Sequence, residues 1–180
     1  IGIGLIGMGT VGTGVVQILQ SASSAMRRKG SSFDIRRVAI RDLSKARDVD
    51  LADGVIGTDP EAVIGDDSVQ VVVELTGAAG AYEWIRSALG AGKDVVTANK
   101  AVIAEHGDEL FALALDQGVD LLFEASVAGG IPIIRSLRSG LVANRVESLY
   151  GILNGTTNYM LTRMSRGEGD YDEILAEAQA

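Results

Sequence analysis

Gly7-Met8-Gly9-Thr10-Val11-Gly12 forms a complete G-x-G-x-x-G motif between an apolar run and a helical pattern. Gly7 permits a tight turn, Gly9 lets the main chain approach a pyrophosphate, and Gly12 lets the helix pack closely on the strand. The amino terminus of the helix then offers N–H groups and a partial positive charge to phosphates. Because glycine-rich turns also serve simple packing, the motif predicts dinucleotide binding only in this strand–turn–helix context.

On the carboxyl-terminal side of this motif, short apolar runs alternate with longer helical patterns. Continuous Val/Ile/Leu runs are typical of strands that are covered on both faces. Gly92 and Gly118 follow two of the helical segments, where a left-handed residue would end the helix. The alternation predicts an α/β fold with a doubly wound parallel sheet. We expect strands at Ile1–Gly7, Ile35–Arg41, Val69–Glu74, Asp94–Thr97 and Val119–Phe123, and helices at Gly12–Ala25, Tyr82–Ala91 and Asp108–Gln117.

The alternation of strand and helix patterns changes after about Gly130, and no flexible linker marks the boundary. We therefore expect residues 1–130 to form a Rossmann-type domain for NAD(P), and residues 131–180 to begin a second domain. The last segment carries no C-cap signal, which predicts that the polypeptide continues or that order is lost there. In this second part we expect a helix over Ile131–Leu141, a longer strand over Arg145–Leu153, and helices from Thr156 and from Asp170.

The amino-acid composition disfavours several classes of binding partner and chemical site. Sixteen Lys and Arg residues against 24 Asp and Glu give a formal net charge of −8, which disfavours nucleic acid and anionic membranes as partners. The sequence has no cysteine, and this excludes disulfides, thiolate zinc sites and a cysteine nucleophile within it. It shows neither a signal-peptide pattern nor an apolar stretch of the roughly 18 residues that a membrane span needs. A cytoplasmic enzyme or binding domain is the simplest interpretation.

The end of the second expected strand bears on the choice of cofactor. An acidic residue usually binds the adenosine ribose of NAD at this place, but here the strand runs into Arg41, followed by Asp42 and Lys45. A guanidinium suits a 2′-phosphate, which it can bind with two parallel hydrogen bonds. The pattern favours NADP, while NAD stays possible, because Arg41 and Lys45 also fit as solvated residues at a strand exit.

Three further runs are more specific than the glycine loop: V-V-T-A-N-K-A at 95–101, E-A-S-V-A-G-G-I-P-I-I at 124–134 and G-I-L-N-G-T-T-N-Y at 151–159. V-V-V-E-L-T-G at 71–77 precedes them at the end of an expected central strand. In this order and spacing the sequence resembles homoserine dehydrogenases over essentially its whole length. That family reduces aspartate 4-semialdehyde to homoserine with NAD(P)H on the route to threonine, isoleucine and methionine. The resemblance implies an oxidoreductase with a small-molecule substrate, assembled as a homodimer or higher homo-oligomer. It also implies that residues 131–180 begin an α+β substrate-binding and dimerisation domain.

The resemblance also implies roles for individual residues. Lys100 matches the family's first active-site lysine, whose ammonium would polarise the aldehyde oxygen and stabilise the developing alkoxide. A solvated lysine after an Asn99 helix cap is the competing interpretation. The cofactor residues carried over are Gly7, Gly9, Thr10, Val11 and Gly12 at the pyrophosphate, Arg41 at the 2′-phosphate, and Thr76, Gly77, Thr97 and Lys100 at the nicotinamide end.

The run that begins at Glu124 resembles the family's monovalent-cation loop. The resemblance implies a sodium-like ion bound by the Glu124 carboxylate and by the backbone carbonyls of Val127, Gly129 and Ile131, and oxygen ligands suit a hard cation. A glycine-rich hinge with a buried, paired glutamate is the alternative. Further along, Gly155 and Thr156 are implied to contact the substrate, although a helix capped by Asn154 or Thr156 would give the same pattern.

Two other functions compete with this reading. Aspartate-semialdehyde dehydrogenase also begins with a Rossmann loop, but it needs a cysteine nucleophile, and this sequence has none. A non-catalytic nucleotide-sensing module would not need Lys100. The family's second lysine, its usual proton donor, has no counterpart up to Ala180, and we expect a 180-residue polypeptide to bind cofactor but to catalyse poorly. His106, in an expected loop, is assigned no catalytic role.

Overall fold

The computed structural model describes residues 1–28, 32–152 and 154–179. The chain forms two compact units, Ile1–Ser126 and Val127–Ala180. None of the helices in these described residues combines the length and the apolar character that a bilayer span requires.

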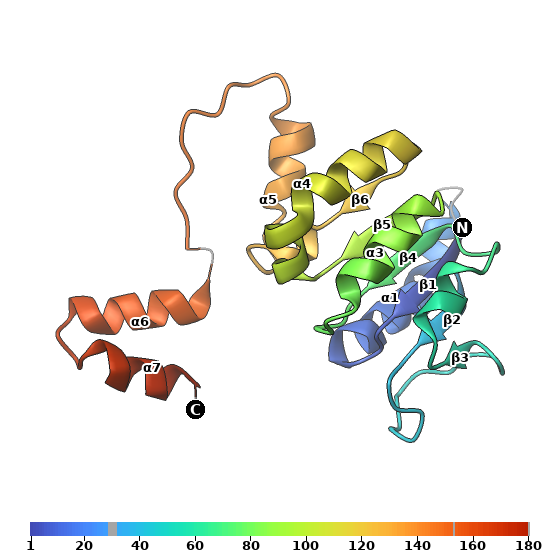
Figure 1. Ribbon diagram of the computed structural model, residues 1–180, viewed down its shortest axis with the longest axis horizontal. Coiled ribbons are helices and arrows are strands. Elements are labelled where there is room, and N and C mark those ends of the chain that lie inside the picture. The colour runs from blue at the N-terminus through green and yellow to red at the C-terminus, as the bar shows by residue number, and fades with distance from the viewer. Residues whose placement is uncertain (29–31, 153, 180) are drawn as a thin grey trace. The chain divides into compact units, whose positions relative to one another are not determined.

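The first unit is built on a parallel sheet with the strand order β3-β2-β1-β4-β5-β6 (Figure 1). The chain runs outward from β1 through β2 to β3, then returns to pair β4 with the other side of β1. Ligands of doubly wound sheets bind at such a switch point, beyond the carboxyl ends of the strands. The strands are β1 Gly2–Ile6, β2 Asp34–Ala39, β3 Ile56–Gly57, β4 Val71–Glu74, β5 Asp94–Thr97 and β6 Leu121–Leu122.

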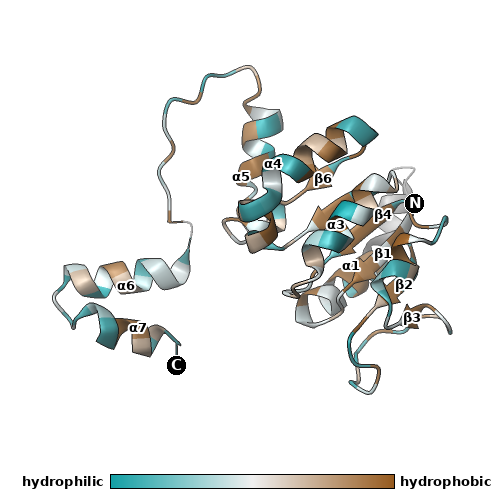
Figure 2. Ribbon diagram, in the orientation of Figure 1, coloured by the Kyte–Doolittle hydropathy of each residue, from teal (hydrophilic) through white to brown (hydrophobic). Residues whose placement is uncertain are grey.

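Both faces of the sheet are covered by helices, as the continuous apolar runs predicted. On one face, α1 (Thr10–Arg28) packs Val16 against Leu5 and Val38. On the other face, α3 (Ala81–Gly90) and α4 (Lys100–Gln117) bury residues such as Leu89 and Leu110 against the strands. Figure 2 shows the strands as an apolar layer between helices that carry polar residues as well. The predicted α/β class with a doubly wound parallel sheet is confirmed.

Helix ends follow the expected chemistry. The side chain of Asn99 accepts a hydrogen bond from the N–H of Val102 at 3.2 Å and caps α4. Gly118 (φ 68°) and Gly92 (φ 72°) adopt left-handed conformations just past α4 and α3. The sequence reading missed β3 and the helix α2 (Pro60–Ile64), which Asp59 caps. A two-residue strand and a five-residue helix are too short to show a periodicity.

Two predictions about α4 are wrong in detail. The helix begins at Lys100 rather than at Asp108, because the Asn99 cap starts it one residue after Asn99 itself. His106 consequently lies in a helix and not in a loop. Its ring packs on Tyr82 with the centroids 4.2 Å apart, and its Nε2 is 4.0 Å from a carboxylate oxygen of Glu105.

All regular secondary structure among the described residues of the second unit is helical. The predicted helix over 131–141 is present as α5 (Ile133–Arg135) followed by a π-helical turn (Ser136–Gly140). The helices predicted from Thr156 and Asp170 correspond to α6 (Gly155–Ser165) and α7 (Tyr171–Gln179). Ile174 of α7 is fully buried, and an ion pair of 2.6 Å between Arg163 and Glu177 joins the two helices.

The strand predicted over Arg145–Leu153 is not formed. Residues 145–152 have no regular secondary structure, and Leu153 lies outside the described residues. A strand is stable only when a neighbour satisfies its backbone groups, and the sheet described here includes no strand from this segment. Val146, Leu149, Tyr150 and Ile152 are correspondingly exposed.

Candidate functional site

A cleft of about 650 Å³ opens at the carboxyl edge of the sheet, around the switch point between β1 and β4. It is lined by the turn after β1, the loop after β2, the start of α2, the loop after β4 and Trp84 of α3. The lining residues are Ile6, Gly7, Met8, Gly9, Ala39, Ile40, Arg41, Asp42, Lys45, Arg47, Thr58, Pro60, Leu75, Thr76, Gly77, Ala78 and Trp84.

The three glycines of the loop differ in the space around them. Gly7 has a left-handed φ of 99°, and its N–H donates to the carbonyl of Ala39 at 2.9 Å. A Cβ on Gly12 would collide with the Gly7 carbonyl oxygen, whereas a Cβ on Gly9 would meet no atom within 4 Å. Two glycines therefore serve the turn itself, and Gly9 leaves open space beside the start of α1. That space fits the close approach of a pyrophosphate to the helix amino terminus.

The predicted pyrophosphate residues divide between the cleft wall and the helix. Gly7 and Gly9 line the cleft. Thr10, Val11 and Gly12 are the first residues of α1, whose leading N–H groups have no partner four residues earlier within the helix. The carbonyl of Gly9 accepts the first such bond, from the N–H of Thr13 at 2.9 Å.

Three cations stand at the β2 side of the cleft: Arg41, Lys45 and Arg47. Arg41 is exposed and follows the end of β2 by two residues. Asp42 beside it is held in its own turn, where the hydroxyl and the N–H of Ser44 donate to the carboxylate at 2.6 and 2.9 Å. These two hydrogen bonds keep the pKa of Asp42 below its ordinary value. The arrangement presents more positive than negative charge to a phosphate.

Arg47 was missed by the sequence reading. Its Nε donates to the carbonyl of Met8 at 2.9 Å, and its Nη1 donates to the carbonyl of Lys45 at 2.6 Å. One side chain therefore ties the loop after β2 to the glycine loop. It lies in a segment without periodicity or motif, and only folding brings it to Met8, 39 residues earlier. Thr58 and Pro60 were missed for the same reason. Trp84 lies in a helix that the sequence did predict, but only folding brings it to the cleft.

The β4 side of the cleft contains the predicted residues Thr76 and Gly77. Thr97 and Lys100 are not among its lining residues. Thr97 is fully buried behind this wall; its hydroxyl donates to Glu74 at 2.7 Å and accepts from the N–H of Asn99 at 3.0 Å. Lys100 is the exposed first residue of α4, directly after its cap. A role for Thr97 in cofactor binding is therefore one of holding this edge in place.

The predicted cation loop has unusual backbone angles. Glu124 begins a 3-10 turn, Glu124–Ser126, and Ala128 (φ 54°) and Gly129 (φ 58°) are two consecutive left-handed residues. The carbonyl of Ile131 accepts from the N–H of Ile133 at 2.8 Å, which leaves a second lone pair on that oxygen. Among the described residues no cluster of three or more His, Cys, Asp or Glu side chains offers a metal site, so an ion here would need backbone carbonyls in addition to the Glu124 carboxylate.

The predicted substrate residues Gly155 and Thr156 are the first two residues of α6 and are exposed. Asn154 caps this helix, accepting from the N–H of Thr157 at 2.8 Å. The local pattern is therefore accounted for by the cap, and the helix start is open to solvent.

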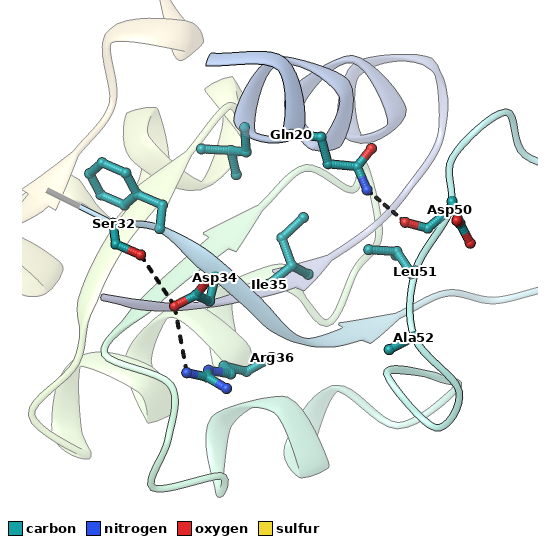
Figure 3. Close-up of a pocket in the computed structure, with 10 residues that line it drawn as sticks. Gln20, Ser32, Asp34, Ile35, Arg36, Asp50, Leu51 and Ala52 are labelled. Atoms are coloured by element: carbon teal, nitrogen blue, oxygen red, sulfur yellow. Dashed lines mark hydrogen bonds and ion pairs between the residues drawn. The ribbon is translucent and has the colours of Figure 1, made fainter. Parts of the chain in front are cut away.

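A second cleft, of about 470 Å³, lies at the opposite edge of the same sheet, where β2 begins (Figure 3). Its polar side chains bond to their neighbours. Gln20 donates to the carbonyl of Asp50 at 2.6 Å, and Arg36 lies 3.6 Å from Asp34. This cleft has neither a glycine loop nor a helix amino terminus among its described lining residues.

Comparison with known proteins gives consistent matches along the chain. The profile of the family described as "Homoserine dehydrogenase, NAD binding domain" matches residues 7–124, and the one described as "Homoserine dehydrogenase" matches residues 132–180. The chain is 46% identical over 179 residues to a homoserine dehydrogenase of Bacillus subtilis, covering 98% of this chain and 41% of that protein.

Solved structures of homoserine dehydrogenases also match the chain. A homoserine dehydrogenase from Thiobacillus denitrificans superposes with a TM-score of 0.84 at 46% identity, over 99% of this chain and 42% of that one. One from S. aureus gives a TM-score of 0.77 at 35% identity, over 99% and 43%. The chain thus spans about two fifths of the length of the relatives that it matches.

Proposed function

The chain belongs to the homoserine dehydrogenase family, and from this membership we propose that the protein interconverts L-homoserine and L-aspartate 4-semialdehyde with NADP. The observation that carries the proposal is the cleft at the carboxyl edge of the sheet, where an open glycine loop, a helix start and three cations meet. When bound there, the nicotinamide supplies or accepts the hydride. The residues of the chain bind and orient the cofactor and polarise the substrate.

The two sides of the cleft suit the two ends of a dinucleotide. Gly9 and the first N–H groups of α1 suit the pyrophosphate, and Arg41 with Lys45 suits a 2′-phosphate. This leaves Thr76 and Gly77 on the β4 side for the nicotinamide end. The cationic character of the β2 side, with Asp42 retained in its own turn, is our reason for proposing NADP before NAD.

Lys100 is proposed as the group that polarises the substrate. It follows the carboxyl end of β5, the edge at which ligands of this sheet bind. Its ammonium would donate to the aldehyde oxygen and stabilise the alkoxide as the hydride arrives. The interaction is stronger in the transition state than in the ground state and therefore acts on kcat.

A decisive experiment is a turnover assay with homoserine and NADP⁺ on the purified full-length protein and on its Lys100→Met variant. We expect the substitution to lower kcat by a factor of ~10²–10⁴, with a much smaller change in dinucleotide affinity. Arg86→Met serves as the control, because it removes an exposed cation of α3 that pairs with Glu109 at the surface. Equal turnover of the unaltered protein and Lys100→Met would remove Lys100 from the mechanism.

We also propose that residues 124–131 bind a sodium-like ion through the Glu124 carboxylate and the carbonyls of Val127, Gly129 and Ile131. The consecutive left-handed residues Ala128 and Gly129 support this, because such angles turn carbonyls to one side of a loop. Replacing sodium by a bulky organic cation should lower turnover, and Glu124→Gln should remove that dependence.

We also propose that the protein is a homo-oligomer. The exposed apolar residues Val142, Tyr150 and Ile152 support this.

A further inference from the structure

Glu74, the last residue of β4, is completely buried. Three groups donate hydrogen bonds to its carboxylate: the N–H and the hydroxyl of Thr76 to Oε1 at 2.6 and 2.7 Å, and the hydroxyl of Thr97 to Oε2 at 2.7 Å. Both strand ends that face the proposed nicotinamide region are therefore joined through one acidic side chain.

The directions of the hydrogen bonds around Glu74 follow from the other partners of the two threonines. Thr97 Oγ1 accepts from the N–H of Asn99 at 3.0 Å, and Thr76 Oγ1 accepts from the N–H of Ala78 at 3.3 Å. The hydroxyl protons of the two threonines are therefore directed toward Glu74. An ionised carboxylate is a pure acceptor and satisfies all three donors at once, whereas a protonated one would need an acceptor of its own.

This negative charge lies just behind the wall of the cleft. Thr76, which donates twice to Glu74, is itself a lining residue. In the described part of the chain no Lys, Arg or His forms an ion pair with Glu74. Its charge is held by neutral donors alone, and a buried charge of this kind acts over longer distances than one in water.

We propose that Glu74 is a positioning residue that also holds a fixed negative charge behind the nicotinamide subsite, and so favours the oxidised cofactor over the reduced one. The inference rests on the proposed function, because it needs the nicotinamide at the β4 side of the cleft. The oxidised ring is a cation and the reduced ring is neutral, and a nearby anion therefore stabilises only the former. A purely structural clip between β4 and β5 would affect both forms equally.

The test is calorimetric binding of NADP⁺ and NADPH, separately, to the unaltered protein and to Glu74→Gln. Glutamine keeps the size of the side chain and removes the charge. We expect the ratio of the Kd for NADP⁺ to the Kd for NADPH to rise on the order of tenfold, the effect of one unit charge across a few side-chain lengths at an effective dielectric constant of about 20. Glu74→Met, a neutral side chain of similar size without hydrogen-bonding needs, should give the same change and replaces the glutamine variant if that one does not fold.

Asp67→Asn is the matched control. Asp67 is exposed in the turn before β4, at the opposite end of the same strand, and its loss should change the ratio by less than about twofold because solvent screens it. Equal weakening of both cofactors in the Glu74 variants would overturn the electrostatic role, as would the failure of both variants to fold. Failure of the unaltered protein to bind either cofactor would instead overturn the proposed function, and this inference with it.

Discussion

The two clefts lie near opposite ends of β2 but differ in what their polar groups do. At the amino edge, Gln20, Asp34 and Arg36 bond to nearby groups of the same cleft. At the carboxyl edge, Gly9 borders open space and Arg41 is exposed to the cleft. Since helices start at the carboxyl edge of a parallel α/β sheet, that edge also carries their partial positive charge. A cleft alone therefore does not indicate a binding site. Polar groups and open space that are left available to a ligand do.

The largest expected effect is the difference between Gly12, which the turn requires, and Gly9, which borders the open space proposed for the pyrophosphate. Gly12→Ala would place a Cβ against the Gly7 carbonyl oxygen, and we expect a loss of about 1–3 kcal/mol of stability together with loss of detectable NADPH binding. Gly9→Ala has room for its Cβ and should keep its stability within about 0.5 kcal/mol, yet bind NADPH at least tenfold more weakly. Thermal unfolding and calorimetry measure both properties.

The Gly9 variant carries the sharper part of that prediction. Because its methyl group would occupy only the open space beside α1, a change in binding without a change in stability identifies that space as the ligand's. Normal NADPH affinity in Gly9→Ala would place the pyrophosphate elsewhere and remove the difference between the two edges.

An intermediate effect on cofactor affinity is expected for Arg41 but not for Arg36, two arginines near opposite ends of β2. Arg41→Ala should weaken NADPH binding by ~1.5–3 kcal/mol, the usual worth of a hydrogen bond to a charged group, and should weaken NADH binding much less. Arg36→Ala, at the amino edge, removes only an exposed pair with Asp34, which is worth little, and should leave both affinities unchanged. If Arg41→Ala reduced NADPH and NADH affinity equally, Arg41 would not read the 2′-phosphate.

The smallest effect concerns the amino edge and should appear in stability alone. Asp66, in the turn before β4, accepts from the Ser68 hydroxyl at 2.6 Å and from Arg37 at 2.7 Å. These bonds, with that from the Ser68 N–H, hold the pKa of Asp66 far below its ordinary value. A lowered folded-state pKa stabilises the protein above the unfolded-state pKa, and that contribution fades as the pH falls through the folded-state pKa.

Asp66→Asn should accordingly lower the melting temperature slightly at pH 7, and the difference from the unaltered protein should shrink below about pH 4. NADPH affinity at pH 7 should not change, because Asp66 lies at the edge away from the glycine loop. A difference in melting temperature that stays constant down to pH 2 would show that the charge of Asp66 contributes nothing.

Much of the carboxyl-edge site was readable from local patterns. Gly7, Gly9 and Gly12 act within one turn, and Arg41 follows the end of one strand, so their roles depend on neighbours in sequence. Arg47 and Glu74 are different, since their partners Met8 and Thr97 lie 39 and 23 residues away. No periodicity encodes such a contact. Thr97 was expected at the cofactor, but it is buried behind the wall, because residues at the end of a central strand are covered on both faces.

The order of apolar runs, helical patterns and turn glycines in the sequence was enough to predict the parallel sheet, the presence and order of its longer helices, and the edge at which a dinucleotide would bind. These follow from the spacing of apolar residues and from backbone geometry. Folding in three dimensions decided which charges lie behind that edge, which arginine ties two loops together, and that residues 145–152 form no strand. Those outcomes depend on partners distant in the chain, and a hydrogen bond forms only where both partners are brought together.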